Sequence, residues 1–385
     1  MNYLSKIPNK LKSIYQKLKP FPTIVKYTPN GTKKMFHISA FTYGNAGDIV
    51  LPIVLRDLFN IGVGVKLWKG QHVYKIVSQT DVDNINRHDA MVIGGGGLFL
   101  KDTNPNDLSG WQWSCSIDEL KQMNVPIIMF AVGYNRFRGQ SEFKPLFKQH
   151  LNAFVGQAKF IGIRNTGSIN KLKDYLETDE LKNKLTFQPC MTTLISKIYP
   201  DLHNYKKKED FIAINCAFDR VELRKGTDLI LNSIARVAKE LSNITRIKYY
   251  SHMLSDNKIL PYFNKYKVQY ELIEMKTEKQ VLEEYIKPRL VIGMRGHAQM
   301  IPFGCLTPIL SIVSHNKLQW FLDDISHPDW GVDVLSPNFE KELLEKSVEI
   351  YTQYTHNMIE VEIAQEKLWQ ITKANLKEIK SLLDN

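Results

Sequence analysis

The most constraining feature of this chain is a run of four glycines that directly follows an apolar segment. Residues 89–99 read Asp-Ala-Met-Val-Ile-Gly-Gly-Gly-Gly-Leu-Phe, and the apolar part, Ala90 to Ile93, predicts a buried parallel strand. The glycines, Gly94 to Gly97, stand where that strand is expected to end. Ligands bind at the carboxyl ends of strands in open α/β sheets, and glycine lets backbone N–H groups approach an anion. We therefore expect a ligand-facing loop here, with a tight turn that only packs as the alternative.

Strand-like and helix-like segments alternate along the rest of the chain. Apolar runs predict strands at residues 35–41, 63–68, 126–132, 160–163, 211–218, 246–251, 268–273, 290–293 and 309–313. Helical periodicity is found at residues 49–59, 142–158, 168–176, 228–241 and 340–384. This alternation is typical of doubly wound parallel sheets, and 385 residues exceed one ordinary hydrophobic core. We expect an α/β protein with two Rossmann-like domains that face each other across a cleft.

The composition of the segments suggests where the domains begin and end. A basic amphipathic segment (1–34) precedes a first Rossmann-like domain (35–200), and a polar, lysine-rich stretch (201–210) is the expected linker. A second Rossmann-like domain (211–336) and a helical C-terminal segment (337–385) complete the chain.

Positive charge is concentrated at the N-terminus. Residues 1–34 contain eight lysines and no acidic residue, so they supply +8 of the net charge of +11. Leucine and isoleucine recur there at helical spacing, as expected of a short amphipathic helix. Such a helix, within residues 1–20, can lie on an anionic membrane surface; a helix packed on the globular body, or a tail, is the alternative. The rest of the chain is nearly neutral, so nucleic acid is not an expected partner.

Cysteine usage and hydropathy point to the cytoplasm. The four cysteines, Cys115, Cys190, Cys216 and Cys305, are widely separated, which argues against a disulfide framework and a zinc site. The chain shows neither a secretory signal nor an apolar run long enough to cross a bilayer. We expect a cytoplasmic protein, peripheral on the inner face of the cell membrane.

Polar residues gather at the expected carboxyl ends of the strands. They are Asn45, Asp48, Asn135, Arg164, Arg295, His297, His315 and Lys317, and Gly95, Gly96 and Gly97 of the glycine run stand beside them. In a doubly wound sheet these positions share one edge, so we expect them in or near the cleft as substrate-binding residues. Asn45 and Asp48 have a structural alternative as turn or cap residues, and Asp48 is the predicted cap of the helix at 49–59.

Two arginines and a histidine carry the chemical hypothesis. Arg164 and Arg295 stand within one residue of an apolar strand, where a guanidinium is costly unless it meets an anion or a carboxylate. One arginine from each domain favours a doubly anionic ligand in the cleft, with internal ion pairs as the alternative. His297, two residues after Arg295, is then a candidate general acid or base, although a structural histidine is the more common case.

The motifs together resemble the polysaccharide pyruvyl transferases. The resemblance rests on Gly44-Asn-Ala-Gly-Asp48, residues 89–99, Ile161-Gly-Ile-Arg-Asn165 with Ser168, and Arg295-Gly-His297 with Gly304, Pro308 and Lys317. Arg164 matches the arginine of the first domain in that family, and Arg295 with His297 matches its arginine–histidine pair. The sequence departs from the family pattern at Gly296, where leucine is common, and at His315, where tyrosine is common.

The resemblance implies a fold of the glycosyltransferase-B type and a specific reaction. Phosphoenolpyruvate would be the donor, and the acceptor would be a sugar of a bacterial surface polysaccharide or its lipid-linked precursor. The product would be a pyruvate ketal, formed with Arg295 and His297 as catalytic residues and Arg164 on the donor. No metal and no cofactor are expected.

A nucleotide-sugar-dependent glycosyltransferase of the same architecture is the alternative. Such an enzyme would need a base-binding pocket and a carboxylate of the second domain near its donor. Glu271 and Glu274 are the candidate carboxylates in the sequence.

Overall fold

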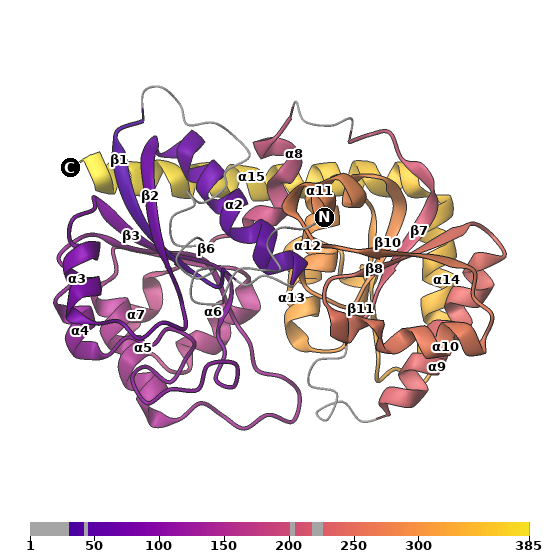
Figure 1. Cartoon of the computed structure of the whole chain (residues 1–385), viewed down its shortest axis with the longest axis horizontal. Helices are drawn as coiled ribbons and strands as arrows, with labels where there is room; N and C mark the ends of the chain where they lie inside the picture. Colours follow the sequence, from indigo (N-terminus) through magenta and orange to yellow (C-terminus); the bar gives the residue numbers. More distant parts are fainter. Residues whose placement is uncertain (1–30, 42–44, 201–204, 218–225, 385) are drawn as a thin grey trace, which may run out of the picture.

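A computed structural model describes residues 31–41, 45–200, 205–217 and 226–384. Two lobes lie side by side, each built on a six-stranded parallel sheet with helices on its faces (Figure 1). The expected α/β architecture with two Rossmann-like domains is confirmed. The predicted basic amphipathic helix and its membrane contact fall on residues 1–30, outside the described part of the chain.

The first lobe contains the strands of the N-terminal half. In chain order they are β1 (Lys33–Ser39), β2 (Val65–His72), β3 (Ala90–Phe99), β4 (Ile127–Tyr134), β5 (Phe160–Ile163) and β6 (Leu185–Phe187). Their order in the sheet is β2-β1-β3-β4-β5-β6. The helical elements are α2 (Ala46–Gly62), α3 (Gln79–Ile85), α4 (Ile117–Lys121), α5 (Pro145–Gln157), α6 (Thr166–Lys173), α7 (Asp179–Asn183), the 3-10 turn η2 (Met191–Leu194) and α8 (Ile195–Ile198).

The second lobe repeats this arrangement. Its strands are β7 (Glu209–Asn215), β8 (Arg246–Ser251), β9 (Tyr270–Glu274), β10 (Pro288–Gly293), β11 (Ile309–Val313) and β12 (Gly331–Asp333), in the order β12-β11-β10-β7-β8-β9. The helical elements are α9 (Thr227–Ser242), η4 (Leu254–Ile259), α10 (Leu260–Lys265), α11 (Glu278–Ile286), α12 (His297–Gly304), α13 (Asn316–Asp324), η5 (Pro328–Trp330), α14 (Phe339–Thr352) and α15 (Tyr354–Asp384).

The apolar runs in the sequence identify the central strands well. Strands β5 and β11 are buried throughout and consist mostly of isoleucine, leucine, valine and phenylalanine. Together with β8, they have the predicted bounds. The short edge strands β6 and β12 were not predicted, because three residues at a sheet edge carry no distinctive apolar pattern. Residues 209–210 of the predicted linker belong to β7.

The prediction of a loop beginning at Gly94 is wrong, because β3 continues through the glycine run. Gly94 pairs with Phe130 and Gly96 with Val132, and the register shifts only between Gly96 and Phe99. Gly95 and Gly96 have φ values of 71° and 93°, which side chains rarely adopt. The glycines therefore let the strand kink without leaving the sheet.

Helix α15 ties the two lobes together. It runs along both of them in Figure 1, from α14 of the second lobe to the start of the first sheet. The buried side-chain amide of Gln365 donates to the carbonyl oxygens of Thr193 (2.9 Å) and Gly304 (3.0 Å), which belong to the first and second halves of the chain. Near the end of α15, Asp384 pairs with Lys33 of β1. No helix among the described residues is both long enough and apolar enough to cross a membrane.

We expect Gln365→Leu to lower the free energy of unfolding by about 2 kcal/mol or more. The substitution leaves two buried carbonyl oxygens and the hydroxyl of Ser196 without their partner, and each unsatisfied buried group costs about 1–3 kcal/mol. Urea unfolding measures the change. Gln370→Leu, at an exposed position of the same helix, is the matched control, and equal stability of the two variants would contradict this role of α15.

Candidate functional site

A cavity of about 350 Å³ lies between the lobes, where the carboxyl ends of both sheets meet. It is lined by residues that follow β1, β3, β4, β5, β7, β8, β10 and β11. The structure brings together in its wall Asn45, Asp48, Gly96, Gly97, Asn135, Arg164, Arg295, His297, His315 and Lys317. Gly95 does not line the cavity. It packs against Leu51 of α2, since a Cβ on Gly95 would lie 2.5 Å from Cγ of Leu51. The rule that strand ends share an edge thus locates the site.

Glycines in this wall or directly behind it make room for side chains of the site. A Cβ on Gly97 would lie 1.7 Å from Nδ2 of Asn135, and one on Gly47 would lie 2.0 Å from Nδ1 of His297. A Cβ on Gly133 would lie 2.6 Å from Nη2 of Arg164. Three of the polar groups of the site therefore pack directly on bare backbone, and any larger residue would displace them.

Arg164 is a buried guanidinium without a carboxylate partner among the described residues. It follows β5 and is 6% exposed, and its Nε has no hydrogen-bond partner within the described chain. Burial lowers the pKa of Arg164, with a small opposing effect of Cys190. A buried cation without a carboxylate is costly, so this position is suited to an anion that enters the cavity.

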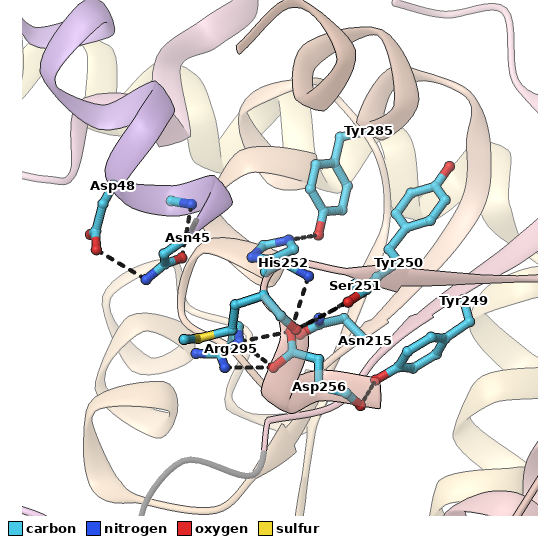
Figure 2. A network of polar contacts seen from close by, with 12 residues as sticks. Asn45, Asp48, Asn215, Tyr249, Tyr250, Ser251, His252, Asp256, Tyr285 and Arg295 are labelled. Carbon is cyan, nitrogen blue, oxygen red and sulfur yellow. Dashed lines mark hydrogen bonds and ion pairs between the residues drawn. The ribbon is translucent and has the colours of Figure 1, made fainter. Parts of the chain in front are cut away.

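Arg295 forms an internal ion pair, which is the alternative to anion binding considered above for both arginines. Its Nε lies 3.0 Å from each carboxylate oxygen of Asp256, which is fully buried, and its Nη2 lies 2.5 Å from Oδ1. The side-chain amide of Asn215 and the backbone N–H of His252 also donate to Oδ2 of Asp256, at 3.2 and 3.0 Å (Figure 2). Arg295 is thus held rigidly at the cavity wall, with its charge largely balanced from behind.

Sequence reasoning missed Asp256 and His252. His252 lies one residue beyond β8, so the strand-end rule could have found it. Asp256 lies in η4 in an ordinary polar sequence, and no local signal marks it as the partner of a residue 39 positions away. His252 lines the cavity and its Nε2 lies 2.5 Å from the hydroxyl of Tyr285, while burial, Arg295 and His297 hold the pKa of His252 well below its ordinary range.

The start of α2 presents a carboxyl group to the cavity. The prediction that Asp48 caps this helix is wrong: the side chain of Asn45 accepts from the N–H of Gly47 at 3.1 Å and occupies the cap position. Asp48 lies in the first turn, where Nδ2 of Asn45 donates to it at 3.1 Å (Figure 2). Burial raises the pKa of Asp48 to about 6, against the opposing effects of Arg295, Asn45 and Lys317.

His297 is the first residue of α12 and is neutral in this environment. Burial first, and then the positive charges of Arg164, Lys317 and Arg295, lower its pKa to about 3. Its Nε2 has no hydrogen-bond partner among the described residues. Asp48 and His297 therefore have pKa values displaced in opposite directions, which is the arrangement expected of an acid and a base in one site.

A contact between the lobes closes one end of the cavity. The ring of His315, at the start of α13, stacks on Phe137 of the first lobe with a centroid distance of 5.1 Å and an angle of 15°. Nζ of Lys317 lies 5.4 Å from the centre of the Phe137 ring. These two residues hence reach the cavity from the second lobe while packing on the first.

Gly296 leaves space in the wall. Its φ of −55° is open to any residue, and a Cβ at this position would have no atom within 4 Å. The leucine common here in the resembled family would therefore project into free space, and its absence enlarges the cavity. Across the described residues, no three histidine, cysteine, aspartate or glutamate side chains converge in a way that could hold a metal ion.

Solved structures show the same fold at low sequence identity. The Anabaena protein Alr3699/HepE, solved with UDP and glucose, shares 10% identity with a TM-score of 0.57, covering 91% of this chain and all of that one. UDP-GlcNAc 2-epimerase from Neisseria meningitidis, solved with UDP-GlcNAc, shares 11% identity with a TM-score of 0.52, covering 92% of this chain and all of that one. Such likeness shows the two-domain, glycosyltransferase-B-like fold alone. No curated protein matches the chain.

A match to a family model assigns the chain to a protein family, which the solved structures do not. The model described as polysaccharide pyruvyl transferase matches residues 45–316, which is most of the chain and includes all the residues that line the cavity except Ala40 and Lys317. The chain therefore belongs to the polysaccharide pyruvyl transferase family and is a transferase.

Proposed function

We propose that the protein transfers the pyruvate unit of phosphoenolpyruvate to a sugar of a bacterial surface polysaccharide, or its lipid-linked precursor, as a ketal. The observation that carries this proposal is Arg164, a buried guanidinium that has no carboxylate partner among the described residues and lines the same cavity as Arg295 and Lys317. Phosphoenolpyruvate carries a carboxylate and a phosphate, and guanidinium groups match both in geometry and charge.

The environments of Asp48 and His297 support different tasks for the two groups. Addition to phosphoenolpyruvate begins with a proton on the methylene carbon, and a neutral imidazole with a pKa near 3 is a poor donor. Asp48 has a pKa of about 6, and the negative charge of a bound donor raises it further. The same negative charge raises the pKa of His297 and makes its neutral imidazole a better proton acceptor. We therefore assign the proton donor to Asp48 and the general base to His297.

The proposed reaction balances with these groups. The electrons of the donor's C=C bond take the proton of Asp48, which leaves a cationic C2. An acceptor hydroxyl oxygen bonds to C2 as its proton passes to Nε2 of His297. The C2–O bond to phosphate then breaks with Arg164 and Arg295 stabilising the departing charge, and a second hydroxyl closes the ketal as its proton leaves with phosphate. The net products are the ketal and inorganic phosphate.

The basic N-terminal segment supports a place for this reaction at a membrane. Eight lysines without an acidic residue favour an anionic lipid surface. A lipid-linked acceptor on the inner face of the cell membrane would lie within reach of an enzyme held there. The proposal thus includes a cytoplasmic, peripheral location.

Incubation with phosphoenolpyruvate and a panel of glycans tests the reaction directly. We expect acceptor-dependent phosphate release and a mass gain of pyruvate minus water. Thermal stabilisation by UDP- or GDP-sugars, without stabilisation by phosphoenolpyruvate, would favour the nucleotide-sugar alternative. That alternative has weaker support, because its candidate carboxylates Glu271 and Glu274 lie on β9, and neither lines the cavity.

Arg164→Gln should weaken phosphoenolpyruvate binding about 100-fold, since two charge-assisted hydrogen bonds are worth about 3 kcal/mol. Calorimetric titration measures the change. The fold should be retained, because the substitution removes a buried charge that has no carboxylate partner in the described structure.

Arg87→Gln, at an exposed site outside the cavity, is the control. Arg295 is less suitable for this test, because its removal would leave Asp256 buried and unpaired. Unchanged binding by Arg164→Gln would remove the central support of the proposal.

Asp48→Asn should abolish turnover, by about 100-fold or more, while phosphoenolpyruvate binds as tightly as before or more tightly. The amide cannot donate the proton, but it also removes a negative charge from an anion site. In the wild type, kcat/KM should fall as pH rises through about 6, since the reactive form is the protonated carboxyl. Substantial turnover by the variant would assign the proton donor elsewhere.

The stabilities of the wild type and of Asp48→Asn test the raised pKa of Asp48 without an activity measurement. The folded-state pKa of Asp48 is raised from 3.8 to about 6, so the free energy of unfolding should fall as pH rises between these values. The contribution is about 3 kcal/mol. Urea unfolding of Asp48→Asn should lack this part of the pH dependence.

His297→Gln should lower kcat by about 100-fold or more and leave phosphoenolpyruvate binding nearly unchanged, because a neutral base contributes to the reaction rather than to anion affinity. Steady-state kinetics and calorimetry separate the two effects. His356→Gln, at an exposed position on α15, is the matched control. Equal kcat in both variants would exclude His297 as the base.

A further inference from the structure

A second pocket, of about 260 Å³, lies beside the main cavity. It is formed between the segment after β4, helix α6 and helix α13, so both lobes contribute to it. Three cations, Arg136, Arg138 and Lys171, and two aromatic residues, Tyr134 and Trp320, line it. Among the described residues that form its wall there is no carboxylate. The lining is therefore that of a site for an anionic ligand with an apolar face.

The second pocket adjoins the main cavity, and the boundary between them leaves no room for a water-sized molecule. This boundary is formed by Asn135, Phe137 and His315 of the main cavity, and by Arg136 and Trp320 of the second pocket. The stacked rings of Phe137 and His315 stand at this boundary. Because Phe137 lines both pockets, they are neighbours, and adjoining units of one ligand can occupy them.

The two arginines are held in place from outside the pocket. The guanidinium of Arg138 donates to both carboxylate oxygens of Asp333, at 2.9 and 2.6 Å, across the two lobes. Arg136 pairs with Glu142, and its Nε donates to the carbonyl oxygen of Gln140 at 3.0 Å. Because neither carboxylate lines the pocket, these contacts orient the guanidinium groups without placing a negative charge in the wall.

Two further side chains complete the pocket. The ammonium of Lys171 lies 3.5 Å from Asp174 in an exposed pair, which is weak and leaves the lysine able to meet a second anion. The indole of Trp320 packs on bare backbone, since a Cβ on Gly167 would lie 2.2 Å from its ring atoms. The ring is therefore fixed, and it offers a flat apolar surface on which the C–H groups of a sugar ring can pack.

We propose that this pocket binds a phosphorylated sugar unit of the acceptor, next to the sugar that reacts in the main cavity. The inference rests on the proposed function, because it takes the reacting sugar to lie beside His297. The pocket is close in volume to the lower end of small-ligand sites, which suits one sugar ring with its phosphate. The fixed indole would pack on the ring, while Lys171 and Arg136 would meet the phosphate.

Binding of glucose 1-phosphate tests the proposal. Glucose, which lacks the phosphate, and inorganic phosphate, which lacks the sugar, are the comparison ligands. We expect calorimetric binding of glucose 1-phosphate to the wild type, weakened about tenfold in Lys171→Gln and in Trp320→Leu. Lys173→Gln, on the same helix but outside the pocket wall, is the matched control and should bind as the wild type does. Phosphoenolpyruvate should bind equally to all four proteins.

Arg164→Gln separates the two sites, because it should lose phosphoenolpyruvate and keep glucose 1-phosphate. The proposal is overturned if Lys171→Gln binds glucose 1-phosphate like the wild type, if the wild type does not bind it, or if inorganic phosphate binds as tightly. Loss of glucose 1-phosphate in Arg164→Gln would place that ligand in the main cavity and would also overturn it. If phosphoenolpyruvate fails to bind the wild type, the proposed function fails, while the effect of Lys171→Gln still decides this inference.

Discussion

The cavity between the lobes depends on how its buried charges are balanced. Arg295 is neutralised from behind by Asp256, which in turn accepts from Asn215 and the backbone of His252. Arg164, on the opposite lobe, has no such carboxylate within the described chain. The result is a site with a rigid frame and an uncompensated positive charge, and burial together with this charge lowers the pKa of His297. One arginine is paired within the protein, and in the proposed function the other binds the donor.

This charge arrangement requires the two lobes to keep a fixed relation. Arg164 and Arg295 follow strands of different sheets, so a small rotation of one lobe would move their side chains apart. Helix α15 contacts both lobes through Gln365, and Arg138 pairs with Asp333 across the cleft. The stack of Phe137 on His315 adds a third contact next to the cavity. Helix α15 therefore helps to hold the two lobes in the arrangement that forms the cavity, although none of its residues lines the cavity.

Much of the architecture could be predicted because parallel strands buried on both faces leave long apolar runs, as at β5 and β11. The site could be approached in the same way, since strand ends in such sheets share an edge. The glycine run was harder to interpret. Its composition is equally compatible with a loop and with a kinked strand, and only the pairing of Gly94 and Gly96 with β4 distinguishes them. Likewise, Asn45 and Asp48 are both good cap residues, and the packing at the start of α2 selects Asn45.

The sequence by itself determined the fold class, the strand-end positions of the polar residues and the resemblance to one family, because these depend on local pattern and order along the chain. Only the tertiary structure decided which arginine is paired, which carboxyl is buried and which glycines make room for a neighbouring side chain. Those properties depend on contacts such as Arg295 with Asp256 or Gly47 with His297, between residues far apart in the chain. Burial and the nearest charge set a pKa, and neither is a property of a residue's sequence neighbours.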